Sequence, residues 1–186
     1  MASQPAHLAE IRHTDLIFPH HENEIAIAGA LGGTSLAKYW VHCDRVLVDG
    51  KKVDDKGDGL TVQALLDMGL TGREIRYWLL SVNYRKPVIF SKGRVERVRK
   101  TLDRLDACVH ALKSVRGGAP YADLDQLCYD IKNGFTTAMD DDLNISAALA
   151  SLFTVIKRIN TLIVNGDIDG AGAKKVLETL SRLNTV

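Results

Sequence analysis

SKGRVERVRKTLDRLDACVHALKS, residues 91–114, contains the clearest periodic pattern of the sequence. Its apolar residues recur at intervals of three and four, which is the period of an amphipathic α-helix. Three more stripes of this period follow a break at Gly117, Gly118 and Pro120. The stripes are Val95, Val98, Leu102, Leu105, Val109 and Leu112; Leu124, Leu127, Ile131, Phe135 and Met139; Leu149, Leu152, Phe153, Ile156 and Ile159; and Val176, Leu177, Leu180 and Leu183. Residues 91–186 are therefore predicted to form an antiparallel helical bundle.

The residues before this bundle predict a small α/β part. Asp15–Pro19 (DLIFP) is an apolar run closed by proline and is interpreted as a buried strand, while residues 1–14 are expected to be loose. His20–Leu31 is interpreted as a helix, and Tyr39–Val48, rich in aromatic and β-branched residues, as a second strand. A strand, a crossover helix and a strand form a parallel unit. The predicted fold class is mainly α with a small α/β remnant, a partial Rossmann-type unit over residues 1–60.

Two short helices are predicted between these parts, at about Thr61–Met68 and Arg73–Asn83. Thr61 and Thr71 are expected to cap their N-termini, because a threonine hydroxyl accepts from a free backbone N–H of the first turn. Asp140–Asn144 is interpreted in the same way, as an acidic turn that caps the next helix through Asn144 or Ser146, rather than as a metal-binding carboxylate cluster.

Composition excludes several classes of protein. The net charge of the 186-residue chain is +1, so it does not bind polyanions through its overall charge, and any nucleic-acid surface has to come from local clustering. The three cysteines, Cys43, Cys108 and Cys128, lie far apart and form no C-x-x-C pair, which fits a reducing compartment. No signal peptide and no apolar run of about 20 residues is evident. We expect a cytoplasmic protein with no membrane association.

A basic run lies between residues 73 and 100, where only Glu74 and Glu96 oppose nine cations and Tyr77, Trp78 and Tyr84 are interleaved. Clustered cations near aromatic residues are typical of a surface that binds a phosphate backbone. The alternative is the solvated face of an amphipathic helix, with the aromatic residues in the core. The candidate nucleic-acid contacts are Arg73, Arg76, Arg85, Lys86, Arg94 and Arg97.

The segment FPHHENE, residues 18–24, places His20 and Glu24 four residues apart, on one side of a helix. An imidazole and a carboxylate can be half of a zinc site. The alternative is a first helical turn whose acidic residues suit the helix dipole.

A second candidate site is the loop KKVDDKGD, residues 51–58. Lysines in a mobile loop can neutralise a triphosphate, but three aspartates stand among the three lysines of this loop and repel a polyphosphate. A solvated turn is the alternative interpretation.

Several segments, in order, resemble cysteinyl-tRNA synthetase, a class I aminoacyl-tRNA synthetase. They are DLIFPHHENEIA at 15–26, YWVH at 39–42, VDGKKV at 48–53, RYWLLSVNYRKP at 76–87 and MDDDLNISAAL at 139–149. The resemblance implies a Rossmann-type catalytic part, a stem-contact region over residues 61–90 and a helical domain over residues 91–186. Members of this family activate cysteine with ATP and transfer it to tRNA.

The resemblance also implies which site residues are kept. His20 and Glu24 match two ligands of the family's zinc, whereas the two cysteine ligands and the HIGH motif find no match. The family's KMSKS loop falls on residues 52–56: Lys52 and Lys56 are the remaining candidate ATP contacts, and Asp55 stands in place of the second lysine of the motif. No catalytic residue is assigned. Zinc and ATP are expected only if another chain completes the site.

Three hypotheses follow. The first is a synthetase-like chain without ligase activity that binds tRNA or a protein partner. The second is one part of an active cysteine–tRNA ligase that is completed by another chain. The third is a helical interaction module that self-associates, because the apolar sheet remnant needs a cover.

Overall fold

The structure is a computed structural model that describes residues 7–32, 36–48, 50–53 and 60–183. The chain is mainly helical with a small parallel sheet, as the sequence predicts. It divides into two compact units. The first unit comprises residues 1–68 and 84–91, and the second, helical unit comprises residues 69–83 and 92–186.

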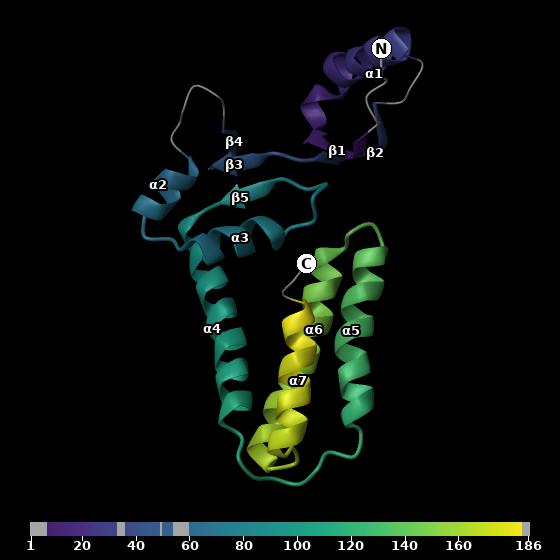
Figure 1. The fold of residues 1–186 in the computed structure, drawn as a ribbon. Helices are drawn as coiled ribbons and strands as arrows, with labels where there is room; N and C mark the ends of the chain where they lie inside the picture. Colours follow the sequence, from purple (N-terminus) through teal and green to yellow (C-terminus); the bar gives the residue numbers. More distant parts are fainter. Residues whose placement is uncertain (1–6, 33–35, 49, 54–59, 184–186) are drawn as a thin grey trace. The chain divides into compact units, whose positions relative to one another are not determined.

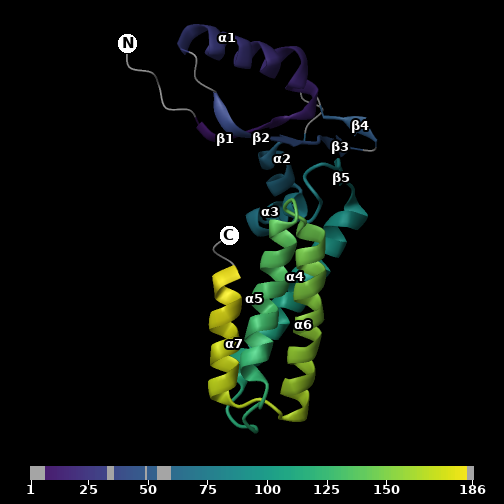
Figure 2. The same cartoon turned by 90° about the vertical axis from the view of Figure 1, so that its right-hand side faces the viewer.

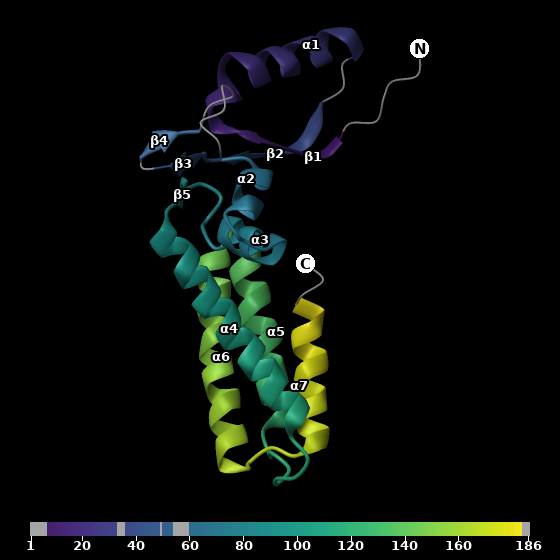
Figure 3. The same ribbon diagram turned by 90° about the vertical axis from the view of Figure 1, so that its left-hand side faces the viewer.

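A parallel strand pair forms the first part of unit 1. Strand β1, His7–His13, pairs in parallel with β2, Ala37–Cys43, so that Ala9 lies opposite Tyr39 and Ile11 opposite Val41. Helix α1, Glu22–Gly32, is the crossover between the two strands (Figure 3). The predicted strand–helix–strand unit is therefore present, with a different first strand.

The prediction of a buried strand at Asp15–Pro19 was wrong. These residues lie in two short helical turns, Thr14–Leu16 and Ile17–His21, and Phe18 is 78% exposed. Proline has no N–H to donate to a sheet ladder, which disfavours a strand that contains it. Residues 7–13, expected to be loose, form β1 because their backbone groups find partners in β2, and a local sequence pattern does not reveal such pairing.

The second predicted strand, Tyr39–Val48, is two strands of two different sheets. After β2 the chain forms β3, Val46–Val48, which pairs antiparallel with β4, Lys51–Lys52, and parallel with β5, Val88–Phe90. The Asp44 carboxylate accepts from the Arg45 N–H at 2.7 Å, and the Asp44 N–H donates to the Tyr84 carbonyl at 2.7 Å. These bonds turn the chain between the two sheets.

All three N-cap predictions are confirmed, and the Thr71 hydroxyl accepts from the Glu74 N–H. In unit 1, the Thr61 hydroxyl accepts from the Ala64 N–H at 3.0 Å and begins α2, Val62–Asp67. In the helical unit, Asn144 caps α6, Ile145–Asn165, by accepting from the Ala147 N–H at 3.2 Å.

The helical unit contains α3, Gly72–Leu80, and four longer helices, α4 to α7, which lie along one another (Figures 1 and 2). The longer helices are α4, Lys92–Ser114; α5, Leu124–Asp140; α6; and α7, Gly170–Leu183. Each predicted stripe supplies a face of the core. The buried residues at its centre are Cys108, Leu112, Leu127, Ile131, Val155, Ile156, Ile159, Leu162, Ile168, Ala173 and Val176. By contrast, the described residues of unit 1 include only three buried ones, His21, Ala37 and Leu65.

Helix α6 is the one described helix that is long and apolar enough to cross a membrane, judged by length and composition. Its apolar face, with Val155, Ile156 and Ile159, is buried in the core of the helical unit, and Lys157 and Arg158 interrupt its sequence. One face of α6 therefore packs in the core of the helical unit.

Gly118 permits a close approach of the α4–α5 link to the α6–α7 link. Its φ is +112°, and a Cβ at this position would lie 2.3 Å from the Ile168 carbonyl oxygen. We predict that Gly118→Ala destabilises the helical unit by about 2 kcal/mol or more, because both the backbone conformation and the contact become strained.

The matched control is Gly117→Ala, because a Cβ there meets nothing within 4 Å. Urea unfolding followed by circular dichroism compares the two variants. Equal stabilities would contradict the close approach.

Candidate nucleic-acid interface

The six predicted nucleic-acid contacts are divided between the two units. Arg73 and Arg76 lie on α3, and Arg94 and Arg97 on α4, which packs against α3 in the helical unit. Arg85 and Lys86 precede β5 in unit 1. The run of cations in the sequence therefore supplies two separate groups, of which the α3–α4 group is the larger.

A capping box fixes the start of α3. The Thr71 hydroxyl accepts from the Glu74 N–H at 3.2 Å, and the Glu74 carboxylate accepts from the Thr71 N–H at 2.6 Å. The same carboxylate accepts from Arg99 Nε on α4 at 2.8 Å, while the Arg99 guanidinium also donates to the Gly69 carbonyl at 2.8 Å. The bond from the Thr71 backbone is the largest cause that lowers the pKa of Glu74. These contacts hold the first turn of α3 against α4.

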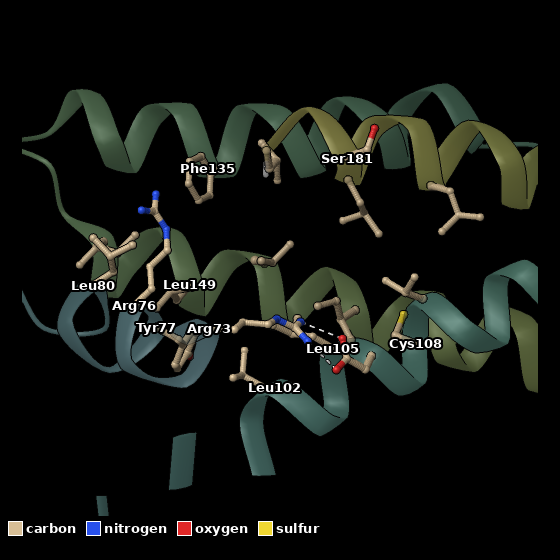
Figure 4. A pocket seen from close by; sticks show the side chains of 18 of the residues that line it. Arg73, Arg76, Tyr77, Leu80, Leu102, Leu105, Cys108, Phe135, Leu149 and Ser181 are labelled. Carbon is tan, nitrogen blue, oxygen red and sulfur yellow. Dashed lines mark hydrogen bonds and ion pairs between the residues drawn. The ribbon is translucent and has the colours of Figure 1, made fainter. Parts of the chain in front are cut away.

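Arg73 is neutralised within the fold. Its guanidinium makes two hydrogen bonds of 2.7 Å to the Asp106 carboxylate (Figure 4). The hydrogen bond lowers the pKa of Asp106 and raises the pKa of Arg73. Two cations of the basic run, Arg73 and Arg99, are thus committed to joining α3 to α4, which the sequence did not indicate.

Other cations of the run are exposed and face water. Within residues 60–183, Arg76, Arg97 and Lys100 are exposed and make no ion pair. In unit 1, the Arg85 guanidinium stacks over the Tyr84 ring at 4.9 Å from its centroid, which is the kind of aromatic–cation surface expected beside a polyanion. The α3–α4 surface therefore offers three unpaired positive charges to a phosphate backbone.

The two predicted zinc ligands do not form a cluster. His20 and Glu24 are both exposed, and the described residues contain no group of three His, Cys, Asp or Glu side chains that could hold a metal. Their neighbour His21 is buried instead. Its Nδ1 lies 3.1 Å from His42 Nε2, and its ring packs against Trp40 at 5.4 Å between centroids. Burial is the largest cause that lowers the pKa of His21, and electrostatic repulsion by His42 is the second.

The sequence does not single out His21, because a helical pattern does not show which of two adjacent histidines turns inward. The predicted ATP contacts, Lys52 and Lys56, lie in or beside a stretch that the structure describes only in part. Lys56, together with Asp54, Asp55 and Asp58, lies outside the described residues. Of Lys52, only the backbone is described, as part of β4 opposite Leu47.

Comparison with known families gives two matches. Residues 11–100 match the model of the class I (C) tRNA synthetase catalytic domain, and residues 134–186 match the DALR domain. The second match lies wholly within the helical unit, over the end of α5 and the whole of α6 and α7.

Curated relatives carry the name cysteine–tRNA ligase. The protein of Chlamydia pneumoniae is 39% identical over 175 residues, which are 92% of this chain and 37% of the relative. The protein of Carboxydothermus hydrogenoformans is 35% identical over 167 residues, which are 88% of this chain and 36% of the relative. The chain thus spans little more than a third of the length of these relatives.

A solved structure is similar in fold. The ternary complex of Agrobacterium radiobacter K84 agnB2 LeuRS with tRNA and LeuAMS matches with a TM-score of 0.68 and 17% identity, over 94% of this chain and 25% of that one. At this identity the likeness shows the fold alone.

The stability of the helical unit is predicted to depend on pH through Glu74. Because the folded state lowers its pKa, the stabilisation by Glu74 is complete above the unfolded value of about 4.5 and is lost as pH falls through the folded pKa. Glu74→Gln should cost about 1 kcal/mol at pH 7 and progressively less toward pH 3.

Urea unfolding at pH 7, 5 and 3 measures this difference. Glu96→Gln is the control, because Glu96 is an exposed residue of α4. A cost of Glu74→Gln that does not change with pH would contradict a role for the carboxylate charge.

Proposed function

We propose that the helical unit of this chain, which is similar to part of the cysteine–tRNA ligases of class I, binds tRNA without ligase activity in this form. The observation that carries the proposal is the set of unpaired cations on α3 and α4, namely Arg76, Arg97 and Lys100. Exposed cations on a rigid pair of helices gain affinity for a phosphate backbone by releasing counterions.

Two comparisons support this proposal. The relatives are named as ligases of cysteine and tRNA, and the solved structure with a similar fold is a complex that contains tRNA. The capping box and the ion pairs of α3 also support it, since a surface that is already rigid loses little entropy on binding.

The absence of ligase activity is proposed from chemistry. Asp55 stands where the family's motif has a lysine, and a carboxylate repels the pyrophosphate that a lysine would attract. His20 and Glu24 match two zinc ligands, and half a ligand set binds zinc poorly. ATP and zinc would be held by Lys52 and Lys56, and by His20 and Glu24, only if residues outside this sequence completed each site.

We further propose that α4 to α7 form the antiparallel bundle of the family's helical domain, and that residues 61–90 act as its stem-contact region. Cysteine usage supports a cytoplasmic protein, because three cysteines in the chain without a C-x-x-C pair suit a reducing compartment.

If the helical unit binds tRNA, arginines of α3 and α4 should contribute unequally to the affinity for tRNA. Arg76→Gln and Arg97→Gln should each weaken binding of labelled tRNA about fivefold and lower the salt slope by about 1. Arg73→Gln should have a smaller effect, because Asp106 already neutralises this guanidinium. Asp106→Asn should strengthen binding by freeing Arg73.

Filter binding or fluorescence anisotropy from low to high salt measures these effects. Equal losses for Arg73→Gln and Arg76→Gln would show that the ion pair does not shield the charge. No detectable binding by the unmodified chain at low salt would remove the proposal.

A second candidate function is one part of a cysteine–tRNA ligase that another polypeptide completes. Helix α1 favours it: its sequence ENEIAIAGALG is apolar on nearly all sides, yet Ile25, Ile27 and Leu31 are 42%, 58% and 84% exposed. A helix that is apolar all round is normally buried. A protein partner, or a second copy of the chain, would therefore gain much apolar contact from covering α1.

Cysteine-dependent exchange of pyrophosphate into ATP separates the two candidates. We predict that the chain alone exchanges at least about 100-fold more slowly than the Chlamydia pneumoniae relative, because of the charge change at Asp55. The same assay is repeated after adding the segments of that relative that lie outside its match to this chain. Exchange restored by these segments would favour the second candidate, and exchange by the chain alone would overturn the proposal of inactivity.

A further inference from the structure

A cavity of about 770 Å³ lies inside the helical unit (Figure 4). All five helices of the unit contribute to its walls, and the volume is within the range of small-molecule sites, about 300–1,000 Å³. Along α4 its lining extends from Leu102 to Lys113, a length of about 16 Å for eleven helical rises.

The walls of the cavity are mainly aliphatic. They include Leu105 of α4, Leu149 and Leu152 of α6, and Leu177 and Leu180 of α7. Each of these residues belongs to an apolar stripe that also supplies buried residues to the core, but each remains only half-buried where it borders the cavity. Apolar surface left open in this way gains free energy when an apolar molecule displaces water from it.

The lining contains few charged groups, and the positive groups outnumber the negative ones. Arg73 and Asp106 neutralise each other, so Arg76 and Lys113 remain against the single carboxylate of Glu178. Arg76 extends from α3 into the cavity (Figure 4) and makes no ion pair within residues 60–183. The excess charge is positive, and Arg76 supplies a guanidinium that can bind a carboxylate through two parallel hydrogen bonds.

We propose that this cavity binds an amphipathic carboxylate with a long aliphatic chain, such as a fatty acid, with its head group on Arg76 and its tail among the leucines. The chemistry of the lining favours this class over a nucleobase. A base needs several partners for its polar edges, whereas the Ser181 hydroxyl already donates to the Glu178 carbonyl and Arg73 is already bound by Asp106. The proposal shares Arg76 with the proposed tRNA contacts but can be tested apart from them, because Arg97 and Lys100 do not line the cavity.

Isothermal titration calorimetry of the full, delipidated chain tests the site with dodecanoate and dodecanol as probes. We expect one saturable site for dodecanoate. Arg76→Gln should weaken dodecanoate binding about tenfold and leave dodecanol binding unchanged, because only the carboxylate uses the guanidinium. Affinity should rise through the series octanoate, decanoate and dodecanoate as more of the cavity is filled.

A second variant blocks the cavity without changing the core. Ser181 is exposed and lines the cavity, so Ser181→Trp should abolish binding of both probes while the circular dichroism spectrum stays the same. Arg97→Gln is the matched control and should bind both probes like the unmodified chain.

Three results would overturn the proposal: no saturable heat with dodecanoate, equal dodecanoate affinity in Arg76→Gln, or unchanged binding in a folded Ser181→Trp variant. Weaker tRNA binding in Arg97→Gln with dodecanoate binding intact would show that dodecanoate does not use the proposed tRNA contact at Arg97.

Discussion

Burial of the aliphatic stripes of α4 to α7 is the main source of stability of the helical unit. The stripes meet in one core, where Leu127, Ile159 and Val176 have no exposed surface. Removing such side chains from water is the main favourable term in folding, and it is concentrated in the helical unit. Helix α3 can present its charged side chains in fixed positions because α4, on which it packs, is anchored by Cys108 and Leu112 in that core.

Ion pairs within the fold determine which cations of α3 and α4 remain available to a ligand. Glu74 is shared between the Thr71 cap and Arg99, and Asp106 holds Arg73. These pairs lie near the surface, where a single ion pair adds little stability, but together they fix the register of α3 against α4. As a result, Arg76 is left without an ion pair within residues 60–183 and lies where the cavity opens.

In unit 1, by contrast, large apolar side chains are exposed to solvent. Its parallel pair β1–β2 and its crossover helix α1 are elements that α/β proteins normally cover on both faces. Here Phe18 and Leu31 are 78% and 84% exposed, and the buried polar residue is His21, which contacts His42. The chain spans about 37% of the length of its Chlamydia pneumoniae relative, and exposed apolar surface of this kind is the surface that a partner or further polypeptide would cover.

Local patterns in the sequence were sufficient to predict the helical elements, the caps at Thr61, Thr71 and Asn144, and a parallel strand–helix–strand order. These features depend on residues three or four positions apart, or on the order of elements, and a linear pattern records both. The folded structure was needed to show that residues 7–13 rather than 15–19 form the first strand, that His21 turns inward, and that Asp106 neutralises an arginine 33 residues away. Strand pairing, burial and long-range ion pairs depend on where the folded backbone brings distant residues together, and the period of a sequence does not contain that information.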